Sequence, residues 1–171
     1  FVNALSFLAV LVMLFLINPR ELRAEKREKK TSTDLLAGIR YASTIPLLRT
    51  ILITMAIVGI FSYEFQTSLP LLARTTFLGG ASDYAALLAA MGAGSVAGGL
   101  FAASRKSIVA REFVIYTLLF GISICVAALM PSIGTAIVMM IFVGFFSINM
   151  SSLGNTMVQL ASSTSMRGQV M

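Results

Sequence analysis

The chain has 171 residues, of which 57% are hydrophobic and only 12% are charged, and its formal net charge is +6. Soluble domains carry about 25% charged residues, so this composition excludes a water-soluble globular protein and predicts a membrane protein. The basic residues stand in connectors beside apolar runs, which is a topology signal and argues against nucleic-acid binding.

The apolar residues form five runs of the length that a helix needs to cross a bilayer. A hydrocarbon core of about 30 Å requires about 20 helical residues. None of the runs alternates in polarity as the strands of a membrane barrel do. We therefore predict an all-α fold, a polytopic transmembrane helical bundle with five spans at residues 1–17, 50–73, 84–103, 113–130 and 135–153.

The connector between the first and second runs, residues 18–49, is the longest in the chain and holds eight of its thirteen basic residues. It contains a candidate short amphipathic helix whose Arg40 would reach lipid headgroups. A connector of this length predicts a boundary between two bundles. Residues 1–17 would then be the last helix of an N-terminal bundle, and residues 50–171 a partial C-terminal bundle of four spans.

If all five runs span, twelve of the thirteen basic residues fall on one side of the membrane, including Arg105 and Arg167, and only Arg74 falls on the other. Short loops rich in Lys and Arg stay in the cytoplasm. We expect a multi-pass protein of a bacterial plasma (inner) membrane, with residues 18–49 and the C-terminus cytoplasmic. The chain begins at Phe1 and stops just after an Arg-Gly turn, so we expect it to be an internal fragment of a larger protein.

The second run contains Glu64, the only charged residue within any of the five. It lies fifteen residues after Arg49, about 22 Å along a helix, which places it in the outer half of the membrane. An intramembrane carboxylate is a candidate proton relay, and it can also hold a closed gate or contact a substrate. Gln66 belongs to the same polar stretch, and Pro70 after it predicts a kink.

The third run carries Gly94 and Gly98, a small-xxx-small pair that lets another helix backbone approach closely. Residues 92–98 read GxGxxxG, which differs from the dinucleotide pattern GxGxxG and has no strand before it. Helix packing is therefore the favoured interpretation.

The fifth run becomes polar halfway along its length. Its polar side chains recur at helical spacing and form a stripe that must face other helices or water. This stripe is either an interhelical hydrogen-bond seam or part of a substrate pathway. Its members include Asn149, Ser152, Asn155, Thr156 and Gln159.

Several peptides resemble one known family. The sequence FQTSLPLLA at residues 65–73, NALSF at 3–7, LAGIRY at 36–41 and RGQVM at 167–171 are similar to a bacterial efflux branch of the major facilitator superfamily, which includes enterobactin-exporter-like and macrolide-efflux-like proteins. The resemblance covers helices six to ten of that fold. It implies two bundles around a central cavity, with the seventh and tenth helices lining it. The superfamily loop motif GxxxDRxGRR is degenerate here, because Arg105-Lys106 has no preceding Asp.

These features favour a secondary active transporter, a proton-driven exporter of amphipathic small molecules of the drug or siderophore type that works by alternating access. Its partners would be the lipid bilayer, a small-molecule substrate, protons and the missing helices of the same protein. The alternative is a permease or scaffold subunit associated with a separate ATPase. The sequence has no His, HExxH or GxSxG, so we expect neither enzymatic activity nor a metal or cofactor.

Overall fold

The computed structural model describes residues 2–16, 35–62, 64–105 and 109–162. The chain divides into two units, Phe1–Thr33 and Asp34–Met171, and each is described by itself. The first unit contains the apolar helix α1 (Val2–Leu16). Its 15 residues extend about 22 Å, less than a hydrocarbon core of about 30 Å, so the predicted first span is helical but short over its described part.

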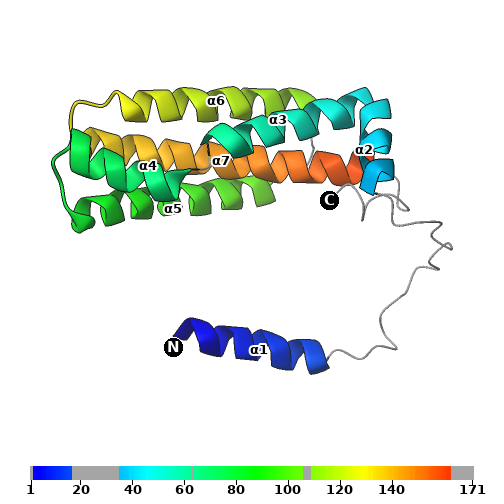
Figure 1. Ribbon diagram of the computed structural model, residues 1–171, viewed down its shortest axis with the longest axis horizontal. Coiled ribbons are helices and arrows are strands. Elements are labelled where there is room, and N and C mark those ends of the chain that lie inside the picture. The colour runs from blue at the N-terminus through cyan, green and yellow to red at the C-terminus, as the bar shows by residue number, and fades with distance from the viewer. Residues whose placement is uncertain (1, 17–34, 63, 106–108, 163–171) are drawn as a thin grey trace. The chain divides into compact units, whose positions relative to one another are not determined.

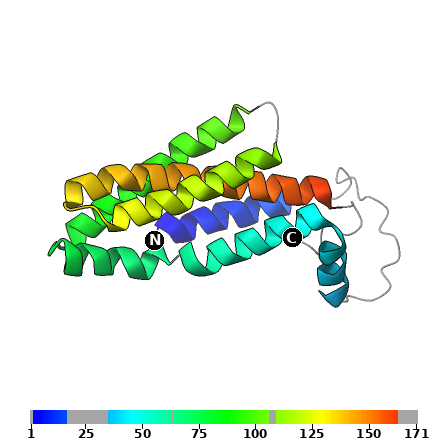
Figure 2. The same cartoon turned by 90° about the horizontal axis from the view of Figure 1, so that it is seen from above.

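The second unit is a bundle of long helices that run side by side, with the short helix α2 lying across one end (Figures 1 and 2). Among the described residues, four segments are long and apolar enough to cross a membrane: Pro46–Thr76, Ala81–Ala103, Ala110–Ala128 and Ile133–Ala161. The all-α transmembrane bundle predicted from the sequence is therefore confirmed. Its elements are α2 (Leu35–Thr44), α3 (Pro46–Ser62), α4 (Phe65–Leu71), the π-helix η1 (Leu72–Thr76), α5 (Ala81–Ala103), α6 (Ala110–Ala128) and α7 (Ile133–Ala161).

The helix that contains Pro70 is interrupted six residues earlier, at Glu64. Glu64 has φ −79° and ψ 37°, and its carbonyl oxygen accepts the first backbone hydrogen bonds of α4, from Thr67 and Ser68. Pro70 lies inside α4, where it can donate no hydrogen bond to the carbonyl of Gln66. The kink expected at Pro70 stays a prediction.

Helix α7 is the centre of the bundle, since it packs against α3, α5 and α6. Its inward residues are almost completely enclosed, whereas large apolar side chains on the outer faces of α5 and α6 are exposed, as suits contact with lipid. The prediction of 135–153 for this span was short, because the helix continues to Ala161 through the polar stripe. Its buried apolar residues are Ala136, Met140, Val143, Met150, Leu153, Met157 and Val158.

The contact between α5 and α7 is made backbone to backbone at glycines. A methyl group added at Gly94 would overlap the carbonyl of Ile141, and one at Gly98 would lie 2.6 Å from the carbonyl oxygen of Phe145. A third glycine, Gly144 on α7, is placed in the same way against the carbonyl of Met91. The structure thus puts Gly94 and Gly98 at a close helix contact and adds Gly144, which the sequence analysis did not single out.

We predict that Gly94→Ala lowers the stability of the purified protein by about 1–3 kcal/mol, because the two backbones must separate to admit the methyl group. Thermal unfolding in detergent measures this change. The matched control is Gly92→Ala in the same helix, where an added Cβ meets nothing within 4 Å. That variant should lose no stability, because alanine favours a helix more than glycine does. Equal melting temperatures for the two variants would contradict the contact.

The turn between η1 and α5 holds a leucine in a strained conformation. Leu78 has φ 52°, in the left-handed region, and its side chain is 88% exposed. The amide of Gly79 donates to the carbonyl of Ala73 at 2.8 Å, and the amide of Gly80 donates to Oδ2 of Asp83 at 2.9 Å. These bonds fix the chain on both sides of Leu78, so the leucine takes a backbone geometry that glycine adopts at little cost.

Leu78→Gly should therefore stabilise the protein by about 0.5–1 kcal/mol, the steric penalty of a left-handed leucine less the entropy cost of a glycine. The measurement is again thermal unfolding. Leu129→Gly is the control, since Leu129 is also exposed at a helix end but has φ −96°. A gain of the same size in both variants would show that strain at Leu78 is not its source.

Candidate functional site

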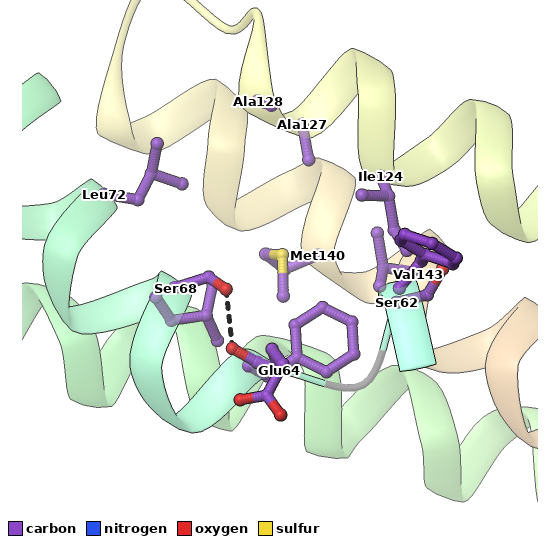
Figure 3. Close-up of a pocket in the computed structure, with 12 residues that line it drawn as sticks. Ser62, Glu64, Ser68, Leu72, Ile124, Ala127, Ala128, Met140 and Val143 are labelled. Atoms are coloured by element: carbon purple, nitrogen blue, oxygen red, sulfur yellow. Dashed lines mark hydrogen bonds between the residues drawn. The ribbon is translucent and has the colours of Figure 1, made fainter. Parts of the chain in front are cut away.

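A half-open pocket lies where α3 gives way to α4. Its volume is about 180 Å³, and it is bounded on one side by the broken helix and on the other by α6 and α7 (Figure 3). It lies toward the end of the bundle where α6 ends at Ala128 and α7 begins at Ile133. Its lining residues are Phe61, Ser62, Glu64, Phe65, Ser68, Leu69, Leu72, Ile124, Ala127, Ala128, Met140 and Val143.

Three polar side chains, Ser62, Glu64 and Ser68, interrupt an otherwise apolar lining. The hydroxyl of Ser68 donates to the carbonyl oxygen of Glu64 at 2.6 Å, the same oxygen that accepts the backbone amide of Ser68. The Glu64 side chain is exposed and makes no hydrogen bond or ion pair with another described residue. Its carboxylate points away from Met140 (Figure 3).

The polar stripe of α7 does not converge on this pocket. Asn149 lies six residues after Val143, about 9 Å farther along the helix, and it is completely buried. Ser152 is half-buried, and its carbonyl oxygen accepts a 2.7 Å hydrogen bond from Thr156. Asn155 and Gln159 are exposed. The predicted site residues therefore fall into two groups. Glu64 lies at the helix break and is followed by Gln66 in α4, whereas the α7 residues lie farther along the bundle.

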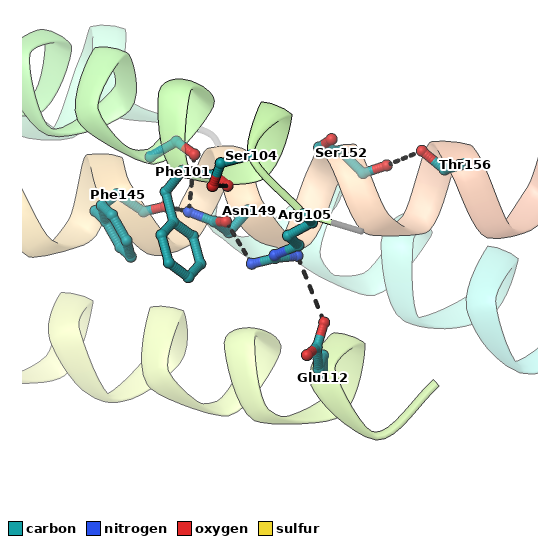
Figure 4. Close-up of polar contacts among 9 residues, drawn as sticks. Phe101, Ser104, Arg105, Glu112, Phe145, Asn149, Ser152 and Thr156 are labelled. Carbon is teal, nitrogen blue, oxygen red and sulfur yellow. Dashed lines mark hydrogen bonds and ion pairs between the residues drawn. The ribbon is translucent and has the colours of Figure 1, made fainter. Parts of the chain in front are cut away.

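Asn149 belongs to the contact between α5 and α7. Its Nδ2 donates to the carbonyl oxygens of Gly98 at 3.3 Å and Phe145 at 2.7 Å, and its Oδ1 accepts from Nη2 of Arg105 at 2.6 Å (Figure 4). The side chain of Asn149 therefore lies in an interhelical hydrogen-bond seam. Arg105, expected in the cytoplasmic loop, folds back over the bundle so that its side chain is 12% exposed. Arg167 lies outside the described residues.

Sequence reasoning missed the wall of the pocket formed by α6. Ile124, Ala127 and Ala128 are apolar residues in a mostly apolar run and carry no signal of their own. Ser62 and Ser68 could have been found, because they flank Glu64 in the sequence. In the described part of the chain, no three His, Cys, Asp or Glu residues gather as a metal ion would require.

A sequence model of one protein family, described as transmembrane secretion effector, matches residues 1–171. The chain belongs to this family. The comparisons of the chain with curated proteins and with solved structures found no match. Transmembrane secretion effectors are major facilitator superfamily transporters, which are generally not enzymes, so the chain is a multi-pass membrane protein with a role in transport. The pocket at Glu64 is the candidate ligand site considered below.

Proposed function

We propose that the chain is part of a secondary active exporter that moves amphipathic small molecules by alternating access, driven by the proton gradient. One observation carries the proposal: the helix break at Glu64 opens into an apolar pocket. Membrane transporters commonly form their binding sites at discontinuous helices, because irregular backbone is tolerated in a membrane only where it lines a cavity or is buried in protein.

The chemistry of the pocket suits a ligand with an apolar body and a polar end. Phe61, Leu72 and Val143 offer apolar surface, Ser62 offers a hydroxyl group, and Glu64 offers a carboxylate on the exposed side, directed away from Met140. The volume of about 180 Å³ is smaller than the 300–1,000 Å³ typical of sites for drug-sized molecules. We infer that this pocket is one wall of a larger cavity, which the remaining helices of the transporter complete.

Glu64 is proposed as the proton-coupling residue. It is the only described carboxylate that lines the pocket, since Asp83 caps α5 and Glu112 lies at the opposite end of the bundle. A carboxylate that binds either a proton or the polar end of a substrate couples the two by competition, because each occupant displaces the other. Proton entry from outside would then release substrate outward.

We predict that Glu64→Gln abolishes export against a gradient but preserves downhill exchange of substrate, because glutamine keeps the shape of the side chain and cannot titrate. Uptake of ethidium, an amphipathic dye, into inverted vesicles that contain the full-length transporter measures both activities. Asp83→Asn is the matched control, since it removes a carboxylate that does not line this pocket, and it should behave as the parent. Uphill transport with unchanged rate and pH dependence in Glu64→Gln would rule out Glu64 as the coupling residue.

The same vesicles distinguish the energy sources. Collapse of the proton gradient by an uncoupler should stop dye uptake, whereas removal of ATP with the gradient maintained should leave it unchanged. The reverse result would favour a permease subunit powered by a separate ATPase.

We also propose that the protein lies in a bacterial plasma membrane, with the end of the bundle that carries Arg105 and Arg111 in the cytoplasm. The pocket would then lie in the outer half of the membrane. The support is the distribution of basic residues, since positively charged loops are retained inside.

This orientation predicts that an impermeant thiol reagent added to intact cells labels Ser132→Cys and leaves Ser104→Cys unlabelled. Both serines are exposed, and they lie at opposite ends of the bundle. The parent for both variants carries Cys125→Ser, because Cys125 is exposed as well. Permeabilised cells should give labelling at both positions. Labelling of the two positions from the same side of intact cells would contradict the topology.

A further inference from the structure

We propose that Arg105 is a positioning residue that holds the ends of α5, α6 and α7 at a fixed mutual geometry and thereby places two walls of the distant pocket. This role depends on the planar guanidinium group of Arg105, and a positive charge alone does not suffice. The residues concerned are called the Arg105 cluster: Phe101, Arg105, Glu112, Tyr116 and Asn149.

The guanidinium of Arg105 touches all three helices or their immediate ends (Figure 4). It lies 5.1 Å from the ring centroid of Phe101 on α5 and 4.6 Å from that of Tyr116 on α6. Its Nη2 donates a 2.6 Å hydrogen bond to Asn149 on α7. These contacts use the positive charge of the guanidinium, which lies over both rings, and its N–H groups at the same time.

The aromatic side chains around the cluster continue the connection. Phe101 on α5 lies 5.6 Å from Phe145 on α7, and Tyr116 on α6 lies 6.2 Å from Phe146 on α7. Phe145 and Phe146 meet edge to face at 5.4 Å. The guanidinium therefore completes a continuous set of contacts that joins α5 to α6 through α7, as well as directly.

Asn149 fixes the position of the guanidinium because every direction of its amide group is used. The donor nitrogen is held by the carbonyl oxygens of Gly98 and Phe145, so the acceptor oxygen must point at Arg105. Gly98 makes this possible, since a Cβ there would approach Nδ2 of Asn149 to 2.9 Å. The position of Arg105 is thus tied to the backbone contact between α5 and α7.

The ion pair with Glu112 is the weakest contact of the cluster. Nη1 of Arg105 and Oε2 of Glu112 are 3.8 Å apart, beyond hydrogen-bond distance, and neither atom has a hydrogen-bond partner. The Glu112 side chain is 40% exposed, but its Oε2 atom and Nη1 of Arg105 are both buried, so neither atom is compensated by solvent or by a hydrogen bond. The asparagine and the two rings therefore determine where the guanidinium lies.

Arg105 must act on the pocket through the helices, because the two lie at opposite ends of the bundle. Tyr116 lies on α6, the helix that also carries Ile124 and Ala127 of the pocket lining. Asn149 lies on α7, the helix that also carries Val143 and Met140 of that lining. A helix transmits a change of tilt at one end to the other end as a displacement, because its backbone hydrogen bonds make it stiff. Release of the cluster would therefore loosen the pocket walls.

The test compares Arg105→Lys with Arg111→Lys, the same change at an exposed arginine in the first turn of α6. Spin labels at Leu100→Cys on α5 and Val114→Cys on α6, both exposed positions, report the distance between the helix ends in the full-length transporter with Cys125→Ser, reconstituted in liposomes. We expect a narrow distance distribution in the parent and in Arg111→Lys, and a clearly broadened one in folded Arg105→Lys.

Ethidium export should fall roughly tenfold in Arg105→Lys, the equilibrium equivalent of losing a charge-assisted hydrogen bond.

Glu112→Gln separates geometry from charge and should keep both the narrow distribution and at least about half of the export, since Nη1 of Arg105 and Oε2 of Glu112 are 3.8 Å apart and form no hydrogen bond. A parental distribution in Arg105→Lys would overturn the proposal, and so would equal broadening in Arg105→Lys and Glu112→Gln. If Arg105→Lys does not fold, Tyr116→Leu removes one ring contact only, and an unbroadened distribution there would contradict the proposal. The distance measurement needs no substrate, so failure of all variants and the parent to export ethidium would count against the proposed function alone.

Discussion

The close approach of α5 and α7 is the contact on which the rest of the bundle depends. Gly94, Gly98 and Gly144 let the two backbones touch where any side chain would hold them apart. In a membrane there is little hydrophobic force between apolar helices, so such packing and the hydrogen bonds that it permits supply much of their association. Here the approach also brings the Gly98 carbonyl within reach of Asn149, and Asn149 in turn orients Arg105.

The bundle therefore differs strongly between its two ends. Around Arg105 the three helices are joined by rings, an amide and a guanidinium, and Asn149 is hydrogen-bonded to both α5 and Arg105. Around Glu64 the backbone is broken, the carboxylate is exposed, and a pocket remains between the helices. An assembly of this kind suits a transporter, since one end keeps the helices together while the other offers groups that a ligand or a proton can occupy.

The distribution of polar groups along α7 follows from the same constraint. A polar side chain within a bilayer must find a partner inside the protein or in water. Asn149 finds its partners on α5 and at Arg105, so its burial is compatible with a membrane interior. Asn155 and Gln159 lie two to three turns farther along the helix, toward the end at which the basic residues gather, and they are exposed.

The sequence by itself determined the class of the protein and its division into spans, because the bilayer requires about 20 apolar helical residues per crossing and leaves charges in the connectors. It also indicated the glycine contact, since Gly94 and Gly98 have the spacing of one helix face. Only the tertiary structure decided which residues meet: the break at Glu64 with its α6 wall, the partners of Asn149, and the return of Arg105 from its loop to the bundle. Spans that are apolar on every side carry little sequence signal of which face packs inward, so these long-range contacts depend on how the helices are rotated against one another.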